Sequence, residues 1–151
     1  MSETKLQHVF QIYIRSSLDR VWAGITSAEM TPQYFHNSRV ESDWKVGSLV
    51  EYFVPTDDGT ERVALRGEIL EIEPRKRLQH SFEFPRLSDP PSRVTYELKQ
   101  MGEMIQLVVV HDKFETETET YKSVFKGWSW ILSGMKSVLE TGQSLPPIQE
   151  N

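Results

Sequence analysis

A long helical pattern near the C-terminal end limits the folds open to this chain more than any other part of the sequence. Apolar side chains recur there at the three- and four-residue spacing of one helix face, over about five turns. They are Tyr121, Val124, Phe125, Trp128, Ile131, Leu132, Met135, Val138 and Leu139. Gly142 follows as a stop signal. A helix with so long an apolar face needs a broad partner surface to cover it.

The segments before this helix alternate apolar and polar residues, which is the pattern of half-buried β-strands. The first alternation covers residues 6–14, and others follow up to residue 111. Residues 57–60 (Asp-Asp-Gly-Thr) and 101–103 (Met-Gly-Glu) have the composition of tight hairpin turns. The alternation changes face near residues 69 and 70, which predicts a bulge. Gly67, in the same strand, marks a bend or a close approach of another backbone.

Two short helices are expected between the first strand and the rest of the sheet. Ser16 precedes Asp19 by three residues, the capping-box spacing of a helix start. Apolar residues then follow at helical spacing over residues 18–26. A second short helix is expected near residues 28–36, with Pro32 in its first turns.

This order of elements predicts an α+β domain. A strand, two short helices, a meander of antiparallel strands and one long helix follow one another, which gives a sheet of six to seven strands. The long amphipathic helix can lie across the concave face of such a sheet. We expect the 151 residues to form a single domain over 1–151, with a core over about 6–142 and a mobile tail over 143–151.

Charge and composition exclude several classes of protein. The chain has 17 basic and 22 acidic residues, and its longest basic run is residues 75–77, so we expect no nucleic-acid partner. Cysteine is absent, which excludes disulfides, thiolate metal sites and cysteine nucleophiles. The first residues lack the pattern of a secretory signal, and no apolar run approaches the ~20 residues of a membrane span. We therefore expect a cytoplasmic protein without membrane insertion.

Five motifs in a fixed order carry a resemblance to known proteins. They are residues 21–26 (Val-Trp-Ala-Gly-Ile-Thr), residues 44–47 (Trp-Lys-Val-Gly), residues 67–74 (Gly-Glu-Ile-Leu-Glu-Ile-Glu-Pro) running into Arg77-Leu78, His111 at the end of the last long strand, and Gly127-Trp128 in the terminal helix. With these motifs the chain resembles the START-like (SRPBCC) superfamily. Within it, the chain is similar to the group named after the activator of heat-shock protein 90 ATPase homologue. The likeness spans about residues 6–142.

The resemblance implies a helix-grip fold, also described as START-like or Bet v-like. In that fold a curved antiparallel sheet wraps around the C-terminal helix and leaves a cavity between them. The family often binds hydrophobic small molecules in this cavity, and many members have no known activity. The co-chaperone after which the group is named carries an additional N-terminal domain, for which we expect no room in 151 residues. Activation of a chaperone ATPase is therefore not the function we expect.

The inward positions of the predicted sheet and helix form a candidate site for a hydrophobic or aromatic small molecule. Apolar walls with a few polar groups are typical of such sites. The candidate ligand-binding residues are Phe35, Tyr52, Phe82, Phe84, Tyr96, Val109, His111, Trp128 and Leu132. The alternative is that these side chains fill the core completely. The residues alone leave both interpretations open.

Histidines supply the only candidates for catalysis. His8, His80 and His111 fall on predicted inward faces, and imidazole can serve as an acid, a base or a hydrogen-bonding group. His111 and His80 are the candidates we retain, against the alternative of neutral, hydrogen-bonded histidines in the wall. Asp112 is not the natural partner of His111, because adjacent residues of a strand face opposite ways. No histidine pair has the short spacing of a metal site, so we expect no metal and no cofactor.

Trp130 lies on the opposite side of the long helix from Trp128, about 200° away on a helical wheel and among small residues. One explanation is that the indole packs beneath a loop of the same chain. The other is a homodimer contact, because tryptophan is enriched at the centres of interfaces.

The function we expect is non-catalytic binding of a hydrophobic small molecule between the sheet and the C-terminal helix, oriented by His111, Tyr96 or His80. One alternative is a protein-interaction module linked to a heat-shock chaperone, which the family name suggests. Another is an enzyme that uses the same cavity, such as a cyclase or a dehydratase with His111 or His80 as the acid or base.

Overall fold

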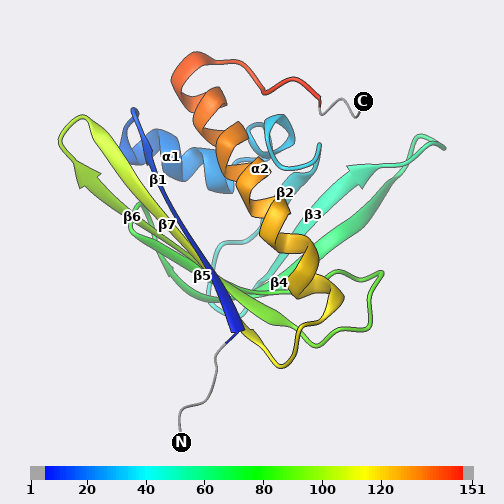
Figure 1. The fold of residues 1–151 in the computed structure, drawn as a ribbon. Helices are drawn as coiled ribbons and strands as arrows, with labels where there is room; N and C mark the ends of the chain where they lie inside the picture. Colours follow the sequence, from blue (N-terminus) through cyan, green and yellow to red (C-terminus); the bar gives the residue numbers. More distant parts are fainter. Residues whose placement is uncertain (1–5, 148–151) are drawn as a thin grey trace, which may run out of the picture.

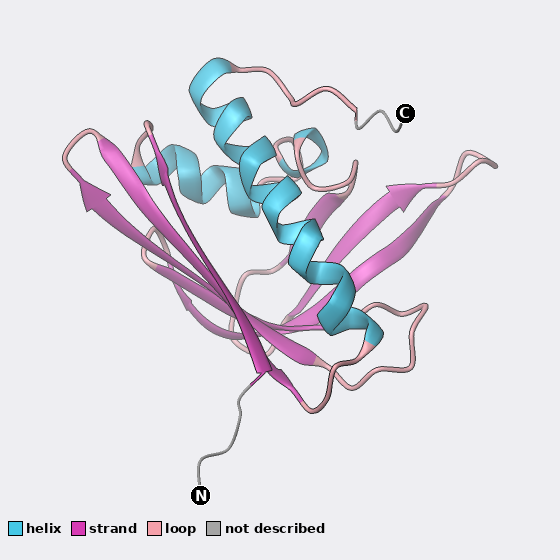
Figure 2. Cartoon of the chain, viewed as in Figure 1, coloured by secondary structure: helices cyan, strands magenta, loops and turns pink. Residues whose placement is uncertain are grey.

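Seven strands and one long helix make up most of the protein, and the computed structural model describes residues 6–147 (Figure 2). The elements in chain order are β1 (Leu6–Ile14), α1 (Leu18–Thr26), the 3-10 turn η1 (Thr31–Gln33), β2 (Arg39–Ser42), β3 (Leu49–Pro55), β4 (Glu61–Glu73), β5 (Arg77–Phe82), β6 (Ser92–Met101), β7 (Met104–Phe114) and α2 (Glu119–Thr141). The predicted α+β class is confirmed. The last four residues of the predicted tail lie outside the described part.

The strands form a single antiparallel sheet in the order β1-β7-β6-β5-β4-β3-β2. Consecutive strands from β2 to β7 are neighbours, while β1 pairs with β7 and so joins the start of the chain to its last strand. Gly59 and Gly102, with φ of +85° and +61°, adopt the left-handed conformations that the two predicted hairpin turns require. The sheet curves around α2, which crosses its concave face (Figure 1). This is the helix-grip arrangement.

Helix α2 presents the predicted apolar face to the sheet. Thr118 caps its first turn by accepting a hydrogen bond from the Tyr121 amide at 3.1 Å, and Gly142 ends it at a φ of +79°. The buried apolar side chains of the helix are Val124, Trp128, Ile131, Leu132, Met135, Val138 and Leu139. Phe125 has the same spacing but is 55% exposed, because it lies at the edge where α2 meets β1.

The two short helices differ from each other in how closely they follow the prediction. α1 covers the predicted residues, although its cap is Ser17, whose hydroxyl accepts a hydrogen bond from the Arg20 amide at 3.2 Å. The second helix is much shorter than residues 28–36 and consists of η1 alone. His36 and Asn37 follow it at φ of 50° and 56°, left-handed conformations that cannot continue a helix.

The predicted bulge and the predicted close approach both occur in β4. Ile69 pairs with His80 and Glu71 with Gln79, so Leu70 is the extra residue that lets the strand bend. At Gly67 a Cβ atom would lie only 1.7 Å from the carbonyl oxygen of Ser81. The bend of the sheet therefore depends on a glycine at this position.

A second bulge in β4, at Ala64, is absent from the sequence prediction. Tyr52 pairs with Leu65 and Phe53 with Val63, so Ala64 has no residue opposite it in β3. In a regular strand Leu65 and Arg62 would face opposite ways. The extra residue brings both onto the concave side of the sheet, where both line the cavity described below.

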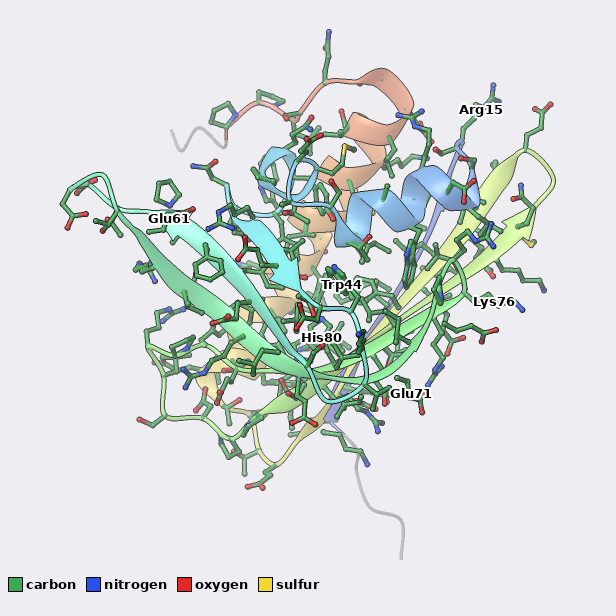
Figure 3. All side chains as sticks on the ribbon, turned by 180° about the vertical axis from the view of Figure 1, so that it is seen from behind. Arg15, Trp44, Glu61, Glu71, Lys76 and His80 are labelled. Atoms are coloured by element: carbon green, nitrogen blue, oxygen red, sulfur yellow. The ribbon has the colours of Figure 1, made fainter. Side chains whose placement is uncertain are left out.

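Charged side chains project from the face of the sheet opposite α2, where Glu61, Glu71 and Lys76 are seen (Figure 3). Arg77 is typical of them, because it donates to Glu71 at 2.6 Å and also pairs with Glu97. Within residues 6–147, no helix combines the length and the apolar content that a membrane crossing requires.

Candidate functional site

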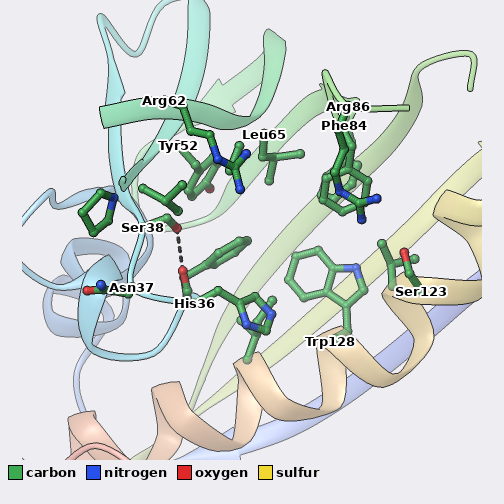
Figure 4. A pocket seen from close by; sticks show the side chains of 18 residues that line it. His36, Asn37, Ser38, Tyr52, Arg62, Leu65, Phe84, Arg86, Ser123 and Trp128 are labelled. Atoms are coloured by element: carbon green, nitrogen blue, oxygen red, sulfur yellow. Dashed lines mark hydrogen bonds between the residues drawn. The ribbon is translucent and has the colours of Figure 1, made fainter. Parts of the chain in front are cut away.

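A cavity of about 570 Å³ lies between the sheet and the first half of α2 and is open to solvent on one side. Its walls come from the loop after η1, from β3 and β4, from the end of β5 with the loop that follows, and from α2 (Figure 4). We call it the grip cavity. Small-molecule sites usually measure about 300–1,000 Å³ and are mostly apolar. The predicted side chains thus leave a space that can hold a modest organic ligand.

The grip cavity contains five of the nine predicted ligand-binding residues. These are Phe35, Tyr52, Phe82, Phe84 and Trp128. The other four, Tyr96, Val109, His111 and Leu132, are buried and do not line the cavity. Tyr96 and His111 contact Trp128 edge-on, at ring-centroid distances of 5.9 and 6.1 Å. They form a layer of side chains that supports the cavity wall.

Aromatic packing fixes the wall itself. Phe35 stacks on Tyr52 with ring centroids 4.6 Å apart, and it meets Trp128 edge-on at 6.1 Å. Phe82 and Phe84 form a second edge-on pair at 5.1 Å. Such pairs contribute about 0.5–1.5 kcal/mol each beyond the area they bury, so the rings are held in place without a ligand.

His111 is hydrogen-bonded through both ring nitrogens to other protein groups. The Trp128 indole N–H donates to His111 Nδ1 at 2.9 Å, so the proton of the neutral ring is on Nε2. That nitrogen donates to the Ser92 hydroxyl at 2.7 Å, which in turn donates to the Phe82 carbonyl at 3.3 Å. Burial, with contributions from nearby histidines, lowers the pKa of His111 to about 3. Neither nitrogen is free to act on a molecule in the cavity.

His80, the second catalytic candidate, also lies outside the cavity lining. Its Nδ1 donates to the Ser81 carbonyl at 2.7 Å, and its Nε2 is buried without a hydrogen-bond partner within residues 6–147. Burial lowers the pKa of His80 to about 4, so the ring is neutral at physiological pH. The arrangement matches a neutral core histidine that helps shape the sheet where β4 bends.

The open side of the cavity carries polar residues that the sequence did not single out. Arg62 from β4 and Arg86 from the loop after β5 line it, together with His36 and Ser123. Burial lowers the pKa of His36, so this ring adds little positive charge at neutral pH. The two arginines therefore supply the charge of the cavity mouth. From the sequence alone both arginines would be assigned to solvent-facing positions. The bulge at Ala64, which is seen only in the structure, places Arg62 on the cavity side.

Two further sequence predictions concern the surroundings of Trp130 and the question of a metal site. Trp130 is half-buried and lies beside Pro147 of the C-terminal segment, His36 and Lys126. Packing beneath a segment of the same chain and a homodimer contact therefore both stay predictions. Within residues 6–147 no three histidine, aspartate or glutamate side chains are grouped so that they could hold a metal ion.

Comparison with known proteins agrees with this architecture. The family model described as Activator of Hsp90 ATPase homolog 1-like protein matches residues 15–140. None of the curated proteins matches the sequence.

Several solved structures have the same fold. The protein encoded by gene BPP1335 of Bordetella parapertussis is 22% identical with a TM-score of 0.74, over 97% of this chain and 81% of that one. The Aha1 dimer from Colwellia psychrerythraea is 14% identical with a TM-score of 0.73, over 91% of this chain and 98% of that one. DynU16, a protein in the dynemicin biosynthetic locus, is 21% identical with a TM-score of 0.74 over 92% of this chain. The match covers only 49% of the length of DynU16. At these identities the likeness shows the fold.

Proposed function

The chain belongs to the family of Activator of Hsp90 ATPase homolog 1-like proteins, and from that premise we propose that it binds a hydrophobic small molecule in the grip cavity without transforming it. The aromatic wall formed by Phe35, Tyr52 and Trp128 would hold the apolar body of the ligand. Phe82 and Phe84 would close the opposite side. The chaperone-linked and enzymatic alternatives stay predictions.

The observation that carries this proposal is an apolar, preformed cavity next to Trp128. An aromatic ring system buries on the order of 150–250 Å². At about 25 cal/mol per Å² this burial contributes at most about 4–6 kcal/mol, so we expect dissociation constants of about 30 μM or weaker. Because the rings of the wall already pack on one another, little of this energy is needed to order the site.

Binding can be tested with 2-naphthylmethanol, a neutral bicyclic probe. We expect it to quench or shift tryptophan fluorescence and to raise the melting temperature by about 3–6 °C at ten times its dissociation constant. Ser123 lines the mouth of the cavity from α2 and is exposed, so Ser123→Phe should fill the opening with little effect on the core. This variant should lose most of the probe-induced shift.

Ser129→Phe is the matched control, because Ser129 is an exposed serine of the same helix that does not line the cavity. It should bind the probe as the unmodified protein does. Equal binding by both variants would place the ligand elsewhere. If neither this neutral probe nor a charged probe with the same apolar body binds the unmodified protein, the proposed function is overturned.

A further inference from the structure

The mouth of the grip cavity is positively charged on a protein that is negatively charged overall. Acidic residues outnumber basic ones by 22 to 17, for a net charge of −5. Among the described residues that line the cavity, however, there are two arginines and no carboxylate. The guanidinium groups of Arg62 and Arg86 extend from the sheet side into the space above Trp128 (Figure 4).

Neighbouring arginines of the same region are paired, which sets Arg62 and Arg86 apart. Arg39 lies against Glu41 and Glu61 at 2.6 and 2.7 Å. Arg66 lies against Glu83 at 2.7 Å. Within residues 6–147, neither Arg62 nor Arg86 has a carboxylate within 4 Å. Their charge is therefore available to a group bound in the cavity.

Adjacent residues of a strand face opposite ways, which separates Arg62 from Glu61, and the bulge at Ala64 sets Arg62 on the cavity side. Arg62 pairs with Val54 across the β3–β4 ladder, and both residues line the cavity. Glu61 is next in the chain but pairs with Arg39 and does not line the cavity. The Glu61 carboxylate thus lies on one face of the strand and the Arg62 guanidinium on the other. Bulges commonly re-aim a side chain in this way beside binding sites.

Arg86 is also held at the mouth by its surroundings. Its guanidinium lies over the Phe84 ring, 5.2 Å from the centroid, and Phe84 belongs to the cavity wall. The loop that carries both residues is tied to the start of α2, because Asp89 accepts hydrogen bonds from the Thr120 amide at 3.0 Å and hydroxyl at 2.8 Å. The loop therefore keeps Arg86 above the first turns of the helix.

From these contacts we infer that the ligand of the grip cavity is an amphipathic organic anion, whose apolar body packs on the aromatic wall while its anionic group lies between Arg62 and Arg86. This inference rests on the proposed function and adds the chemical class of the ligand. Guanidinium groups suit oxyanions because they donate two parallel hydrogen bonds. A cationic ligand of the same shape is disfavoured by the same two charges.

The test compares three probes with one apolar body at pH 7.5, by titration calorimetry: 2-naphthoate, 2-naphthylmethanol and 2-naphthylmethylammonium. We expect 2-naphthoate to bind about tenfold more tightly than the alcohol, as charge-assisted hydrogen bonds at a partly exposed site allow. The ammonium should bind more weakly than the alcohol. The double variant Arg62→Gln/Arg86→Gln should reduce 2-naphthoate binding about tenfold and leave alcohol binding within about twofold.

Arg66→Gln is the control, because Arg66 belongs to the same strand but pairs with Glu83 and does not line the cavity. It should keep the preference for 2-naphthoate, whereas loss of that preference in this variant would contradict a local role of Arg62 and Arg86. If the alcohol binds as well as 2-naphthoate, the inference is overturned while the proposed function stands. If none of the three probes binds the unmodified protein, the proposed function fails as well.

Discussion

At the scale of single residues, the most informative side chain is His111, whose environment permits only one charge state. Its Nδ1 must accept, because the partner is an indole N–H that can only donate. A second ring proton would face Trp128 and lose this bond. Burial acts in the same direction and lowers the pKa of His111 to about 3. The imidazole therefore serves as a neutral link between α2, β7 and β6, and Trp128 is positioned by it.

This environment predicts that the protein is less stable in mild acid. The pKa of His111 is about 3 and that of His80 about 4, whereas both rings have their ordinary pKa near 6.5 in the unfolded chain. Between these values the unfolded state binds more protons, so stability rises with pH. Between pH 7.5 and 5 each histidine should cost about 2 kcal/mol of the free energy of unfolding. Urea denaturation at pH 7.5, 6 and 5 measures this loss.

The variant His111→Gln separates the titration from the packing. Its absolute stability is expected to fall at every pH, so the informative quantity is the difference between pH 7.5 and pH 5. That difference should shrink by about 2 kcal/mol, because one of the two rings with large pKa shifts is gone. A pH dependence equal to that of the unmodified protein would show that His111 is not kept neutral in the fold.

At the scale of secondary structure, β4 carries the features on which the shape of the sheet depends. Gly67 has no room for a side chain, because a Cβ would lie 1.7 Å from the Ser81 carbonyl oxygen. Gly67→Ala should therefore force the backbones of β4 and β5 apart and cost about 1–3 kcal/mol or more. Gly127→Ala in α2 should instead stabilise the protein. No other atom lies within 4 Å of the added Cβ, and alanine favours a helix over glycine by about 0.5–1 kcal/mol. Thermal unfolding of the two variants measures both effects. A Gly67→Ala protein with the melting temperature of the unmodified protein would contradict the close contact between Gly67 and Ser81.

The elements were predictable where one periodicity dominates a long segment. α1 and α2 follow from apolar residues at helical spacing with caps at their ends, and the Leu70 bulge follows from a change of face in the alternation. The residues near 28–36 also contain helix signals, but tertiary contacts override them. Thr31 is fully buried and its hydroxyl accepts a hydrogen bond from the Val40 amide at 3.0 Å, which ties this turn to β2.

The candidate site was predictable only in its apolar part. Aromatic residues on inward faces, such as Tyr52 and Trp128, follow from periodicity because burial follows it too. The charged residues at the mouth of the cavity do not follow from periodicity. Val63 and Leu65 alternate as in a regular strand, which would place Arg62 on the face of the sheet away from α2. The extra residue at Ala64 is visible only from the pairing of β4 with β3. Charged residues at the rim are thus the part of a binding site that sequence periodicity reveals least.

At the scale of the whole molecule, the grip cavity joins segments that are distant in the chain. β1, β7 and β6 lie close to one another along one side of the molecule, and α2 packs against β1, whereas the β3–β4 arm extends away from the helix (Figure 1). The cavity occupies the space between that arm and the first half of α2. A ligand there would contact both parts, which are otherwise joined by the curved sheet and by Phe35, whose ring contacts Tyr52 and Trp128. Its binding energy therefore couples the arm to the helix.

This coupling predicts where a ligand slows amide exchange. With 2-naphthoate bound, protection should increase in the segments that line the cavity, because local opening of any of them would now also release the ligand. These segments are residues 35–38, 52–55, 62–65, 82–86 and 123–131. Amides of β1 and of the β6–β7 hairpin should change little, since these elements are already closed by the sheet and the helix. Hydrogen–deuterium exchange with and without the probe measures the pattern, and Ser123→Phe should abolish it. Protection confined to α2, or spread evenly over the sheet, would mean that the ligand does not bridge the arm and the helix.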